Sequence, residues 1–294
     1  MPSAIYWSGL RALNILKTPG STKRWERYLA ERRREARDEA PAEDNGAMRR
    51  IPGFEHDLPP MPRDFPQTPG LNFQLTSDEA RYLRRRISNA TVGRNEWGLE
   101  HNLFAAFADK AVPPNTDFPW DHPRAISLHA DTRHLLDIAS AFSSVMYGAT
   151  LLYNYLLCSR RCRDGDEDAG DWLERYRGSI GLWIANLREA ELDLLKSGIH
   201  DIARIAPKVR HSVTIKTLRF VTTWIDIARD PQRLTESKRA FDVVENRERE
   251  LKGPLGTSRF ANLEARKRWK YESGRRLTYR WAVARSYLND IAAT

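Results

Sequence analysis

The longest uncharged run of the chain extends from Ile138 to Cys158 and reads IASAFSSVMYGATLLYNYLLC. Its apolar side chains recur at the spacing of one face of an α-helix, at Phe142, Val145, Met146, Ala149, Leu152, Tyr153 and Leu156. A second face carries hydroxyl and amide side chains, which we call the polar stripe: Ser140, Ser143, Tyr147, Thr150 and Asn154. Because a surface helix would carry Lys, Glu or Arg on that face, we predict a central helix that is enclosed on most sides.

The polar stripe predicts contacts inside the protein. An unpaired buried hydroxyl or amide costs about 1–3 kcal/mol, so these groups either bond to packed neighbours or line a pocket. The run is also about as long as a membrane span. Six of its positions are Ser, Thr, Asn or Gly, however, and a lone span would expose them to lipid. We therefore expect a central helix of a soluble domain and no membrane partner.

Composition indicates an ordered protein with acidic partners. Hydrophobic residues make up 41% of the chain and nine Trp are present, which excludes a disordered chain. The 48 basic residues outnumber the 39 acidic residues, which gives a net charge of +9 and a pI near 9.7. This balance favours nucleic acid as the partner, with an anionic membrane surface as the next commonest class.

The sequence carries no motif for a metal, a nucleotide cofactor or secretion. Only two cysteines occur, Cys158 and Cys162, and neither a second cysteine pair nor closely spaced histidines follow, so we expect no metal site. A phosphate-binding P-loop and a dinucleotide-binding glycine pattern are both missing, which predicts no cofactor. The N-terminus lacks the features of a secretory signal, and we expect a cytoplasmic protein.

Helical periodicity continues on both sides of the central run, without sustained strand alternation. The predicted fold class is mainly α: a large irregular helical bundle around one buried central helix, with a Pro-rich extended connector. We divide the chain into an N-terminal helical segment (1–40), a Pro-rich connector (41–75) and a helical main domain (76–294). Local signals predict particular helix ends, since Thr76 with Glu79 forms a capping box and Gly253 ends the helix before it.

A basic stretch near the C-terminus, EARKRWKYESGRRLTYRWAVAR, suggests a nucleic-acid surface. This C-terminal basic segment (residues 264–285) holds eight basic and two acidic residues, a local charge of +6, with aromatic rings interleaved. Cations neutralise phosphates and flat rings accept stacked bases. The predicted nucleic-acid-binding residues are Arg266, Lys267, Arg268, Trp269, Lys270, Arg275, Arg276, Tyr279, Arg280 and Trp281. The alternative is that the rings belong to the core and the arginines line the outside.

Candidate catalytic residues come from three places. Tyr147 and Asn154 belong to the polar stripe, and Glu248 is one of the clustered carboxylates in NRERELKGP. Asp226 is a lone carboxylate beside Trp224 on an apolar helix, and Asp290 is comparable. One carboxylate in an aromatic pocket is enough for base excision after a base is flipped out of the stack. The sequence Glu250-Leu251-Lys252 matches the short end of a nuclease-type Glu-x-Lys element. That element usually lies on a strand, whereas this stretch is predicted to be helical, so an ion-paired surface is the better interpretation.

Several stretches together resemble a known family. They are MPSAIYWSGL (1–10), LPPMP (58–62), LTSDEARYLRRRI (75–87), AFSSVMYGATLLYNYLL (141–157), FVTTWIDIARDP (220–231), NRERELKGP (246–254) and LTYRWAVARSYLNDI (277–291). The set is similar to an uncharacterised bacterial family, domain of unknown function 6361, which is met in phage-defence gene clusters beside helicases and phospholipase-D-like proteins. The resemblance covers essentially the whole chain.

The resemblance implies a setting, bacterial anti-phage defence, and no mechanism. The matched motif positions are Tyr153, Asn154, Glu248, Lys252, Tyr279, Arg280 and Trp281. Members of the family carry a further region before the first matched stretch, whereas this sequence begins at that stretch. We therefore expect either a short form or a truncated start.

Three functions remain open at this point. The first is a DNA-engaging protein of bacterial anti-phage defence, which acts on or marks phage DNA together with a helicase or a phospholipase-D-like protein. The second is a DNA-processing enzyme, either a glycosylase that removes a modified base or a nuclease. The third is a structural subunit of a defence complex, which would co-purify with its partners without affinity for DNA.

Overall fold

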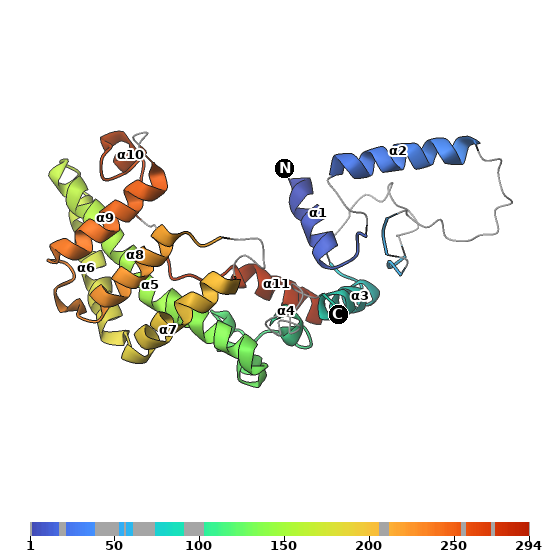
Figure 1. Ribbon diagram of the computed structural model, residues 1–294, viewed down its shortest axis with the longest axis horizontal. Helices are drawn as coiled ribbons and strands as arrows, with labels where there is room; N and C mark the ends of the chain where they lie inside the picture. The colour runs from blue at the N-terminus through green and yellow to red at the C-terminus, as the bar shows by residue number, and fades with distance from the viewer. Residues whose placement is uncertain are drawn as a thin grey trace. The chain divides into compact units, whose positions relative to one another are not determined.

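The chain folds mainly into α-helices, and the predicted bundle around one buried central helix is confirmed (Figure 1). The computed structural model describes residues 2–17, 22–38, 53–55, 57–60, 74–90, 103–205, 212–253, 257–271 and 274–293. Within these ranges the only β pairing is a single antiparallel bridge between Leu16 and Phe54. Most of the predicted Pro-rich connector, 41–75, lies outside the described residues.

Contacts divide the chain into two compact units. Unit 1 comprises Met1–Thr116 and Ala282–Thr294, and unit 2 comprises Asp117–Trp281. The boundaries predicted after residues 40 and 75 both lie inside unit 1.

Unit 1 consists of helices that are held together in part by arginines donating to backbone carbonyl groups. It contains α1 (Pro2–Ala12), α2 (Thr22–Asp38), α3 (Ser77–Ser88), α4 (Leu103–Phe107) and, apart from its first residue, α11 (Trp281–Ala292). The predicted capping box begins α3, where Thr76 Oγ1 accepts the Glu79 N–H at 3.3 Å and Glu79 Oε2 accepts the Thr76 N–H at 2.8 Å. Further along α3, Arg84 donates to the carbonyl of Ile291 at 2.9 Å, so this cation holds α3 to α11.

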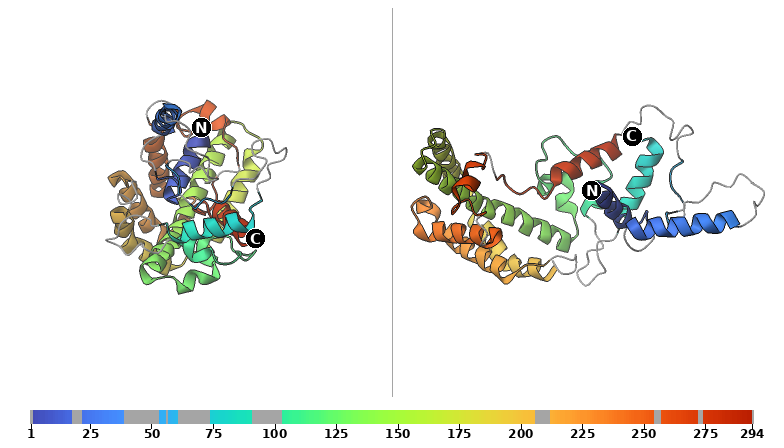
Figure 2. Two further views of the ribbon diagram at one scale, coloured as in Figure 1. Left: turned by 90° about the vertical axis from the view of Figure 1, so that its right-hand side faces the viewer. Right: turned by 90° about the horizontal axis from the view of Figure 1, so that it is seen from above.

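Unit 2 is organised around α5 (Ala130–Arg163), the helix that contains the uncharged run. Four helices pack against it, namely α6 (Ala169–Asn186), α7 (Glu189–Ile205), α8 (Ile215–Ala228) and α9 (Lys238–Lys252) (Figure 2). The short α10 (Leu263–Lys267) also contacts α5. Side chains of α5 such as Val145, Leu152 and Leu157 are fully buried, which explains why the run carries no charge.

Two tryptophans bring neighbouring helices into close contact with α5. The indole N–H of Trp183 donates to the carbonyl of Ser144 and that of Trp224 donates to the carbonyl of Val145, each at 2.9 Å. At Gly148 an added Cβ would lie 2.3 Å from the Trp183 ring, so only glycine allows α6 to approach this closely. The predicted stop of α9 is also confirmed, because Gly253 caps it with φ of +70° and donates its N–H to the carbonyl of Arg249.

Among the residues that the structure describes, α5 is the one helix with the length and composition needed to cross a membrane. Half of its apolar 18-residue stretch is buried inside the protein. A single helix of this kind is weak support for a membrane span, since the central helix of a bundle has the same composition.

Candidate functional site

The polar stripe of α5 is covered by residues 274–280, which have no regular secondary structure and which we call the covering segment. Ser143 Oγ donates to the carbonyl of Leu277 at 2.7 Å, and the hydroxyl of Tyr279 donates to the carbonyl of Ala139 at 2.9 Å. Gly274 has φ of +82°, and an added Cβ would lie 2.2 Å from Thr150 Cγ2. Part of the stripe therefore bonds to a packed neighbour, and that neighbour is an irregular segment rather than a helix.

Next to the covering segment, unit 2 contains a pocket of about 400 Å³, which we call the α5–α9 pocket. Helices α5, α8 and α9 and the covering segment line it. Its apolar and aromatic side chains include Phe142, Met146, Tyr147, Phe220 and Leu251. The volume lies within the range of small-molecule sites in proteins, and mostly apolar walls with a few polar groups are typical of such sites.

Glu248, on α9, is the one carboxylate in the lining of this pocket. The residue is 6% exposed, and its Oε1 accepts the backbone N–H of Arg259 at 2.8 Å. Its second oxygen, Oε2, is buried and has no hydrogen-bond partner among the described residues. Buried polar atoms are normally paired, because an unpaired one costs about 1–3 kcal/mol and more when it is charged. The carboxylate thus has one oxygen held in place and one unsatisfied.

Tyr153 supplies a neutral hydroxyl to the same pocket. Its oxygen accepts a hydrogen bond from Arg259 Nη1 at 3.0 Å. Burial raises the pKa of Tyr153, while the hydrogen bond from Arg259 acts in the opposite direction. The phenol is therefore protonated at neutral pH, and its O–H can donate one hydrogen bond. Arg259 orients both polar groups, since its backbone bonds Glu248 and its side chain bonds Tyr153.

Three cations complete the lining of the pocket: Arg247, Lys252 and Arg275. Arg247 is already engaged, because it donates to Thr217 Oγ1 at 2.9 Å and lies over the Phe220 ring at 5.4 Å. Lys252 and Arg275 are exposed and form no ion pair with any described residue. The open side of the pocket is therefore positively charged next to the buried carboxylate.

The Glu-x-Lys stretch divides between surface and pocket. Glu250 pairs with Arg247 at 3.4 Å on the exposed side of α9, which is the ion-paired surface expected for it. The two residues that share the pocket are Glu248 and Lys252 instead. Residues four apart lie on one face of a helix, whereas residues two apart do not. The four-residue spacing of Glu248 and Lys252 was therefore the sequence signal that these two share a site.

The catalytic candidates are not all brought together. Tyr147 lines the α5–α9 pocket with Glu248, whereas Asn154 is fully buried and is not in its lining. Asp226 is exposed and pairs with Lys196 at 3.5 Å, and Asp290 is exposed in unit 1. Among the predicted carboxylates, Glu248 lies in the lining of a pocket, whereas Asp226 and Asp290 are exposed.

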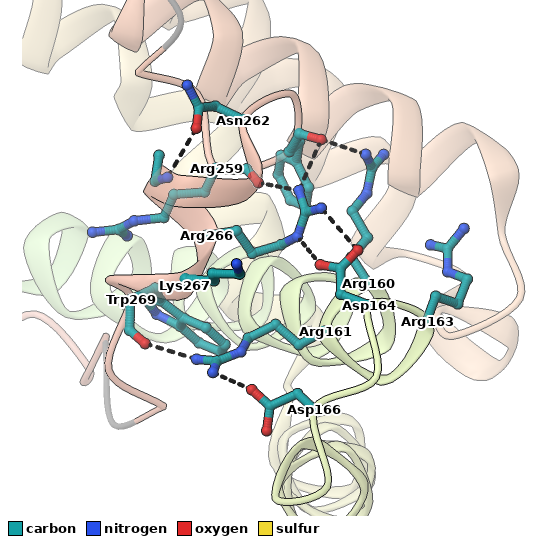
Figure 3. Close-up of polar contacts among 12 residues, drawn as sticks. Arg160, Arg161, Arg163, Asp164, Asp166, Arg259, Asn262, Arg266, Lys267 and Trp269 are labelled. Atoms are coloured by element: carbon teal, nitrogen blue, oxygen red, sulfur yellow. Dashed lines mark hydrogen bonds and ion pairs between the residues drawn. The ribbon is translucent and has the colours of Figure 1, made fainter.

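The first basic residue of the C-terminal basic segment, Arg266, is buried and bonds to groups within the protein. Arg266 is 8% exposed and makes a two-pronged contact with Asp164, from Nε at 2.6 Å and from Nη2 at 3.1 Å (Figure 3). Its Nη1 donates to the carbonyl of Arg259 at 2.7 Å. The hydrogen bond from Arg266 holds the pKa of Asp164 below its usual range. The phosphate contact predicted for Arg266 is corrected accordingly, because this guanidinium already has its partners.

Two arginines of α5 extend this arrangement, which we call the arginine network (Arg160, Arg161 and Arg266). Arg160 donates to the carbonyl of Phe260 and to Glu245 Oε1, each at 2.6 Å. Arg161 donates to the carbonyl of Trp269 at 3.1 Å and forms an ion pair with Asp166 (Figure 3). Neighbouring acids and backbone carbonyls thus occupy all three guanidinium groups.

The aromatic residues of the basic segment also separate into two groups. Trp269 and Trp281 are 2% and 4% exposed, so the alternative that these rings belong to the core holds for them. Tyr279 is 49% exposed.

Arg276 lies over the rings of Phe118 and Trp120, at 4.8 Å and 5.7 Å from their centroids.

Phe118 and Trp120 stack on each other with centroids 4.9 Å apart, and the sequence analysis did not select them. The available signal was the pair of aromatic residues in the Pro-rich loop VPPNTDFPWDHP.

Of the other six cations of the segment, Arg285 is half-buried and donates to the carbonyls of Pro114 and Thr116, at 3.4 Å and 3.1 Å. The other five face solvent: Lys267, Arg268, Lys270, Arg275 and Arg280. Lys267 pairs with Glu264 at 3.2 Å. The other four have no ion pair with a described residue. The basic residues of the segment therefore divide into those that bond within the protein and those that are accessible to a ligand.

Metal ligands and thiols add no second site within the described residues. No group of three or more His, Cys, Asp or Glu side chains is placed there to hold a metal ion. Cys158 is buried, and burial raises the pKa of its thiol to about 12. A thiol with such a pKa is protonated at neutral pH.

One comparison with known proteins gives a match. The family model described as "Family of unknown function (DUF6361)" matches residues 1–294. No curated protein and no solved structure matches the chain.

Proposed function

The chain belongs to the DUF6361 family, and from this premise we propose that it is a DNA-engaging protein of bacterial anti-phage defence. The family description states no activity, so the defence setting rests on the sequence resemblance alone. DNA is the proposed partner, with a helicase or a phospholipase-D-like protein as a second partner in the cytoplasm. No cofactor is part of the proposal.

The observation that carries the proposal is the accessible part of the C-terminal basic segment. Arg268, Lys270, Arg275 and Arg280 are exposed and lack ion pairs with described residues, and the half-exposed ring of Tyr279 lies in the same stretch. Cations without intramolecular partners gain most from a phosphate backbone, because binding releases the counterions that surround DNA. An exposed ring adds about 1–3 kcal/mol for each base that stacks on it.

The test is the salt dependence of DNA binding, measured by fluorescence anisotropy with labelled single-stranded and duplex DNA between 50 and 300 mM salt. A triple variant, Arg268→Ala with Lys270→Ala and Arg280→Ala, removes three accessible cations. The matched control, Arg233→Ala with Lys238→Ala and Arg239→Ala, removes three exposed unit 2 cations that also lack ion pairs with described residues.

The slope of log affinity against log salt is negative. We expect the first triple variant to reduce the magnitude of this slope by about 2–3 and the control to leave it unchanged. Equal losses in both triple variants would show a response to net charge alone and would overturn the proposed surface. Absence of binding to any DNA would overturn the function.

A DNA-processing enzyme is the second candidate function, and the buried carboxylate of Glu248 favours it. A carboxylate in an aromatic pocket is the arrangement expected for an enzyme that acts on an extruded base. The assay incubates modified and unmodified phage DNA with the protein, with and without magnesium, and then treats it with alkali. Magnesium-dependent cuts indicate a nuclease and alkali-only breaks a glycosylase. Unchanged DNA in every condition excludes both activities.

A further inference from the structure

We propose that the α5–α9 pocket binds one nucleobase that carries an exocyclic amino group, together with the phosphate attached to its sugar. The inference rests on the proposed DNA function for the source of that base, which is then a base of the bound strand. It adds a chemical class of ligand, a second site apart from the accessible cations, and a recognition residue, Glu248.

The walls of the pocket suit a flat ring. Phe142, Tyr147 and Phe220 present aromatic surface from α5 and α8, and Met146 adds a flexible apolar side chain. Aromatic walls bind bases of any sequence, since every base has a π-face. The pocket volume of about 400 Å³ is large enough for one nucleotide.

The free oxygen of Glu248 selects a hydrogen-bond donor. Oε1 is already used by the backbone N–H of Arg259, which leaves Oε2 as an acceptor without a partner among the described residues. An ionised carboxylate can only accept hydrogen bonds, so the ligand atom that faces it must be an N–H or O–H. The exocyclic amino groups of cytosine, adenine and guanine are donors of this kind, and carboxylates pair with the amino group of cytosine.

The cations exclude a positively charged ligand and add an anionic end. An amine or a guanidinium would satisfy Glu248, but it would meet Arg247, Lys252 and Arg275 in the same lining. A ligand with a donor at one end and a phosphate at the other satisfies both the carboxylate and the two cations without ion pairs, Lys252 and Arg275. A nucleotide has this arrangement.

The carboxylate is held in position by the arginine network. Arg266 and Arg160 donate to the carbonyl groups of residues 259 and 260, and the N–H of Arg259 donates to Glu248. Because one oxygen is fixed in this way, the direction of the other is fixed as well. Such prior positioning lowers the entropy cost of binding and sharpens selectivity.

The first arm of the test uses free nucleotides and isothermal titration calorimetry. One series consists of dCMP, its analogue with hydrogen in place of the amino group, and dUMP, and a second series consists of dAMP, the corresponding purine nucleotide and dIMP. We expect the amino member of at least one series to bind about tenfold or more tightly than its hydrogen analogue, the value of one hydrogen bond to a charged acceptor. The second arm repeats the comparison with single-stranded oligonucleotides that contain one such base among abasic sites.

The decisive variant is Glu248→Gln. The backbone N–H of Arg259 requires an acceptor, so the oxygen of the introduced amide takes the place of Oε1 and its NH₂ group takes the place of Oε2. A donor now stands where an acceptor stood, and we expect the preference to move from the amino base to the keto base. The matched control is Asp242→Asn on the exposed side of α9, outside the pocket lining, which should leave the preference of the wild-type protein unchanged.

The outcomes separate the pocket proposal from the proposed DNA function. Equal binding of amino and hydrogen members in both series and both arms, or a preference that survives Glu248→Gln in a folded protein, overturns the inference. Salt-dependent DNA binding without base preference leaves the proposed function standing and removes the pocket proposal. Base preference among free nucleotides without DNA binding supports the pocket and removes the DNA function. Melting temperatures of the variants show whether each one is folded.

Discussion

Two arginine-rich regions of unit 2 use the same side chain in opposite ways. In the arginine network the guanidinium groups of Arg160, Arg161 and Arg266 bond to acids and backbone carbonyls (Figure 3). Around the α5–α9 pocket and along the covering segment, Arg275 and Arg280 are exposed and have no ion pair with a described residue. Cations that have partners stabilise the fold, and cations that lack them are available to a ligand.

The two regions are joined through residues 259 and 260. Their carbonyl groups accept from Arg266 and Arg160, and the N–H of Arg259 donates to Glu248 in the pocket. The network therefore serves as a support for the pocket. Variants in the network should change stability first, whereas variants at the pocket should change binding first.

The largest effect is expected for Arg266→Ala. It leaves Asp164 without its two-pronged partner in a partly buried position, and removal of one member of such a pair costs about 3–5 kcal/mol. Urea denaturation measures the free energy of unfolding. The control is Lys267→Ala on the same helix, whose exposed pair with Glu264 is expected to contribute less than about 1 kcal/mol. If the two variants were equally stable, the assigned role of the network would be wrong.

A smaller loss, about 1–3 kcal/mol, is expected for Asp164→Asn, because the amide still accepts one hydrogen bond from Arg266. The pKa of Asp164 is lowered in the folded protein by that hydrogen bond, so its contribution is complete above the ordinary aspartate pKa of about 3.9. It is lost as the pH falls through the lower folded-state value. The difference in stability between wild type and variant should thus narrow below about pH 4 in denaturation curves taken at several pH values. A difference that stays constant from pH 6 to pH 2 would contradict this assignment.

Gly274→Ala tests how closely the covering segment approaches α5. Alanine is strained at φ of +82°, and its Cβ would meet Thr150 Cγ2, so we expect a loss of about 1–2 kcal/mol in the free energy of unfolding. Adding Thr150→Ser removes the methyl group in the clash and should restore part of the loss. The control is Gly178→Ala in α6, where a Cβ meets open space and helix propensity predicts a small gain. Equal effects at the two glycines would show that the covering segment is not tightly packed.

Arg275→Ala should affect stability least and completes the comparison. The side chain is exposed and forms no ion pair with a described residue, so the free energy of unfolding should change by less than about 0.5 kcal/mol. The salt slope of DNA binding should fall by about 1, as for one lost phosphate contact. Thermal melting and anisotropy titrations on the same preparation measure both quantities. Loss of stability without loss of DNA binding would show that Arg275 stabilises the fold, as the arginine network does, and does not contact DNA.

The central helix and several helix ends were predictable because their causes are local. The absence of charge from Ile138 to Cys158 predicted enclosure, and α5 is the core helix of unit 2. The capping box of Thr76 and Glu79 joins residues three apart, and Gly253 acts on the turn directly before it. Helix geometry alone determines such contacts, so sequence spacing is sufficient to find them.

The candidate site was predictable only in part. Tyr147 was selected as a member of the polar stripe and Glu248 as one of a cluster of carboxylates, and both line the α5–α9 pocket. Arg259, which orients the carboxylate, was not selected, because it lies in a loop eleven positions away with no periodic pattern around it. The pairing of Arg266 with Asp164 joins residues 102 positions apart, and the sequence contains no sign of it.

The sequence by itself determined that this chain forms helices, which helix is enclosed, and that its surface carries excess positive charge, because periodicity, capping and composition act over a few residues or over the whole chain at once. Only the tertiary structure decided which of those charges are paired and which polar group is buried without a partner. Pairing requires that side chains from distant parts of the chain meet within about 3 Å, and such meetings depend on the packing of whole helices.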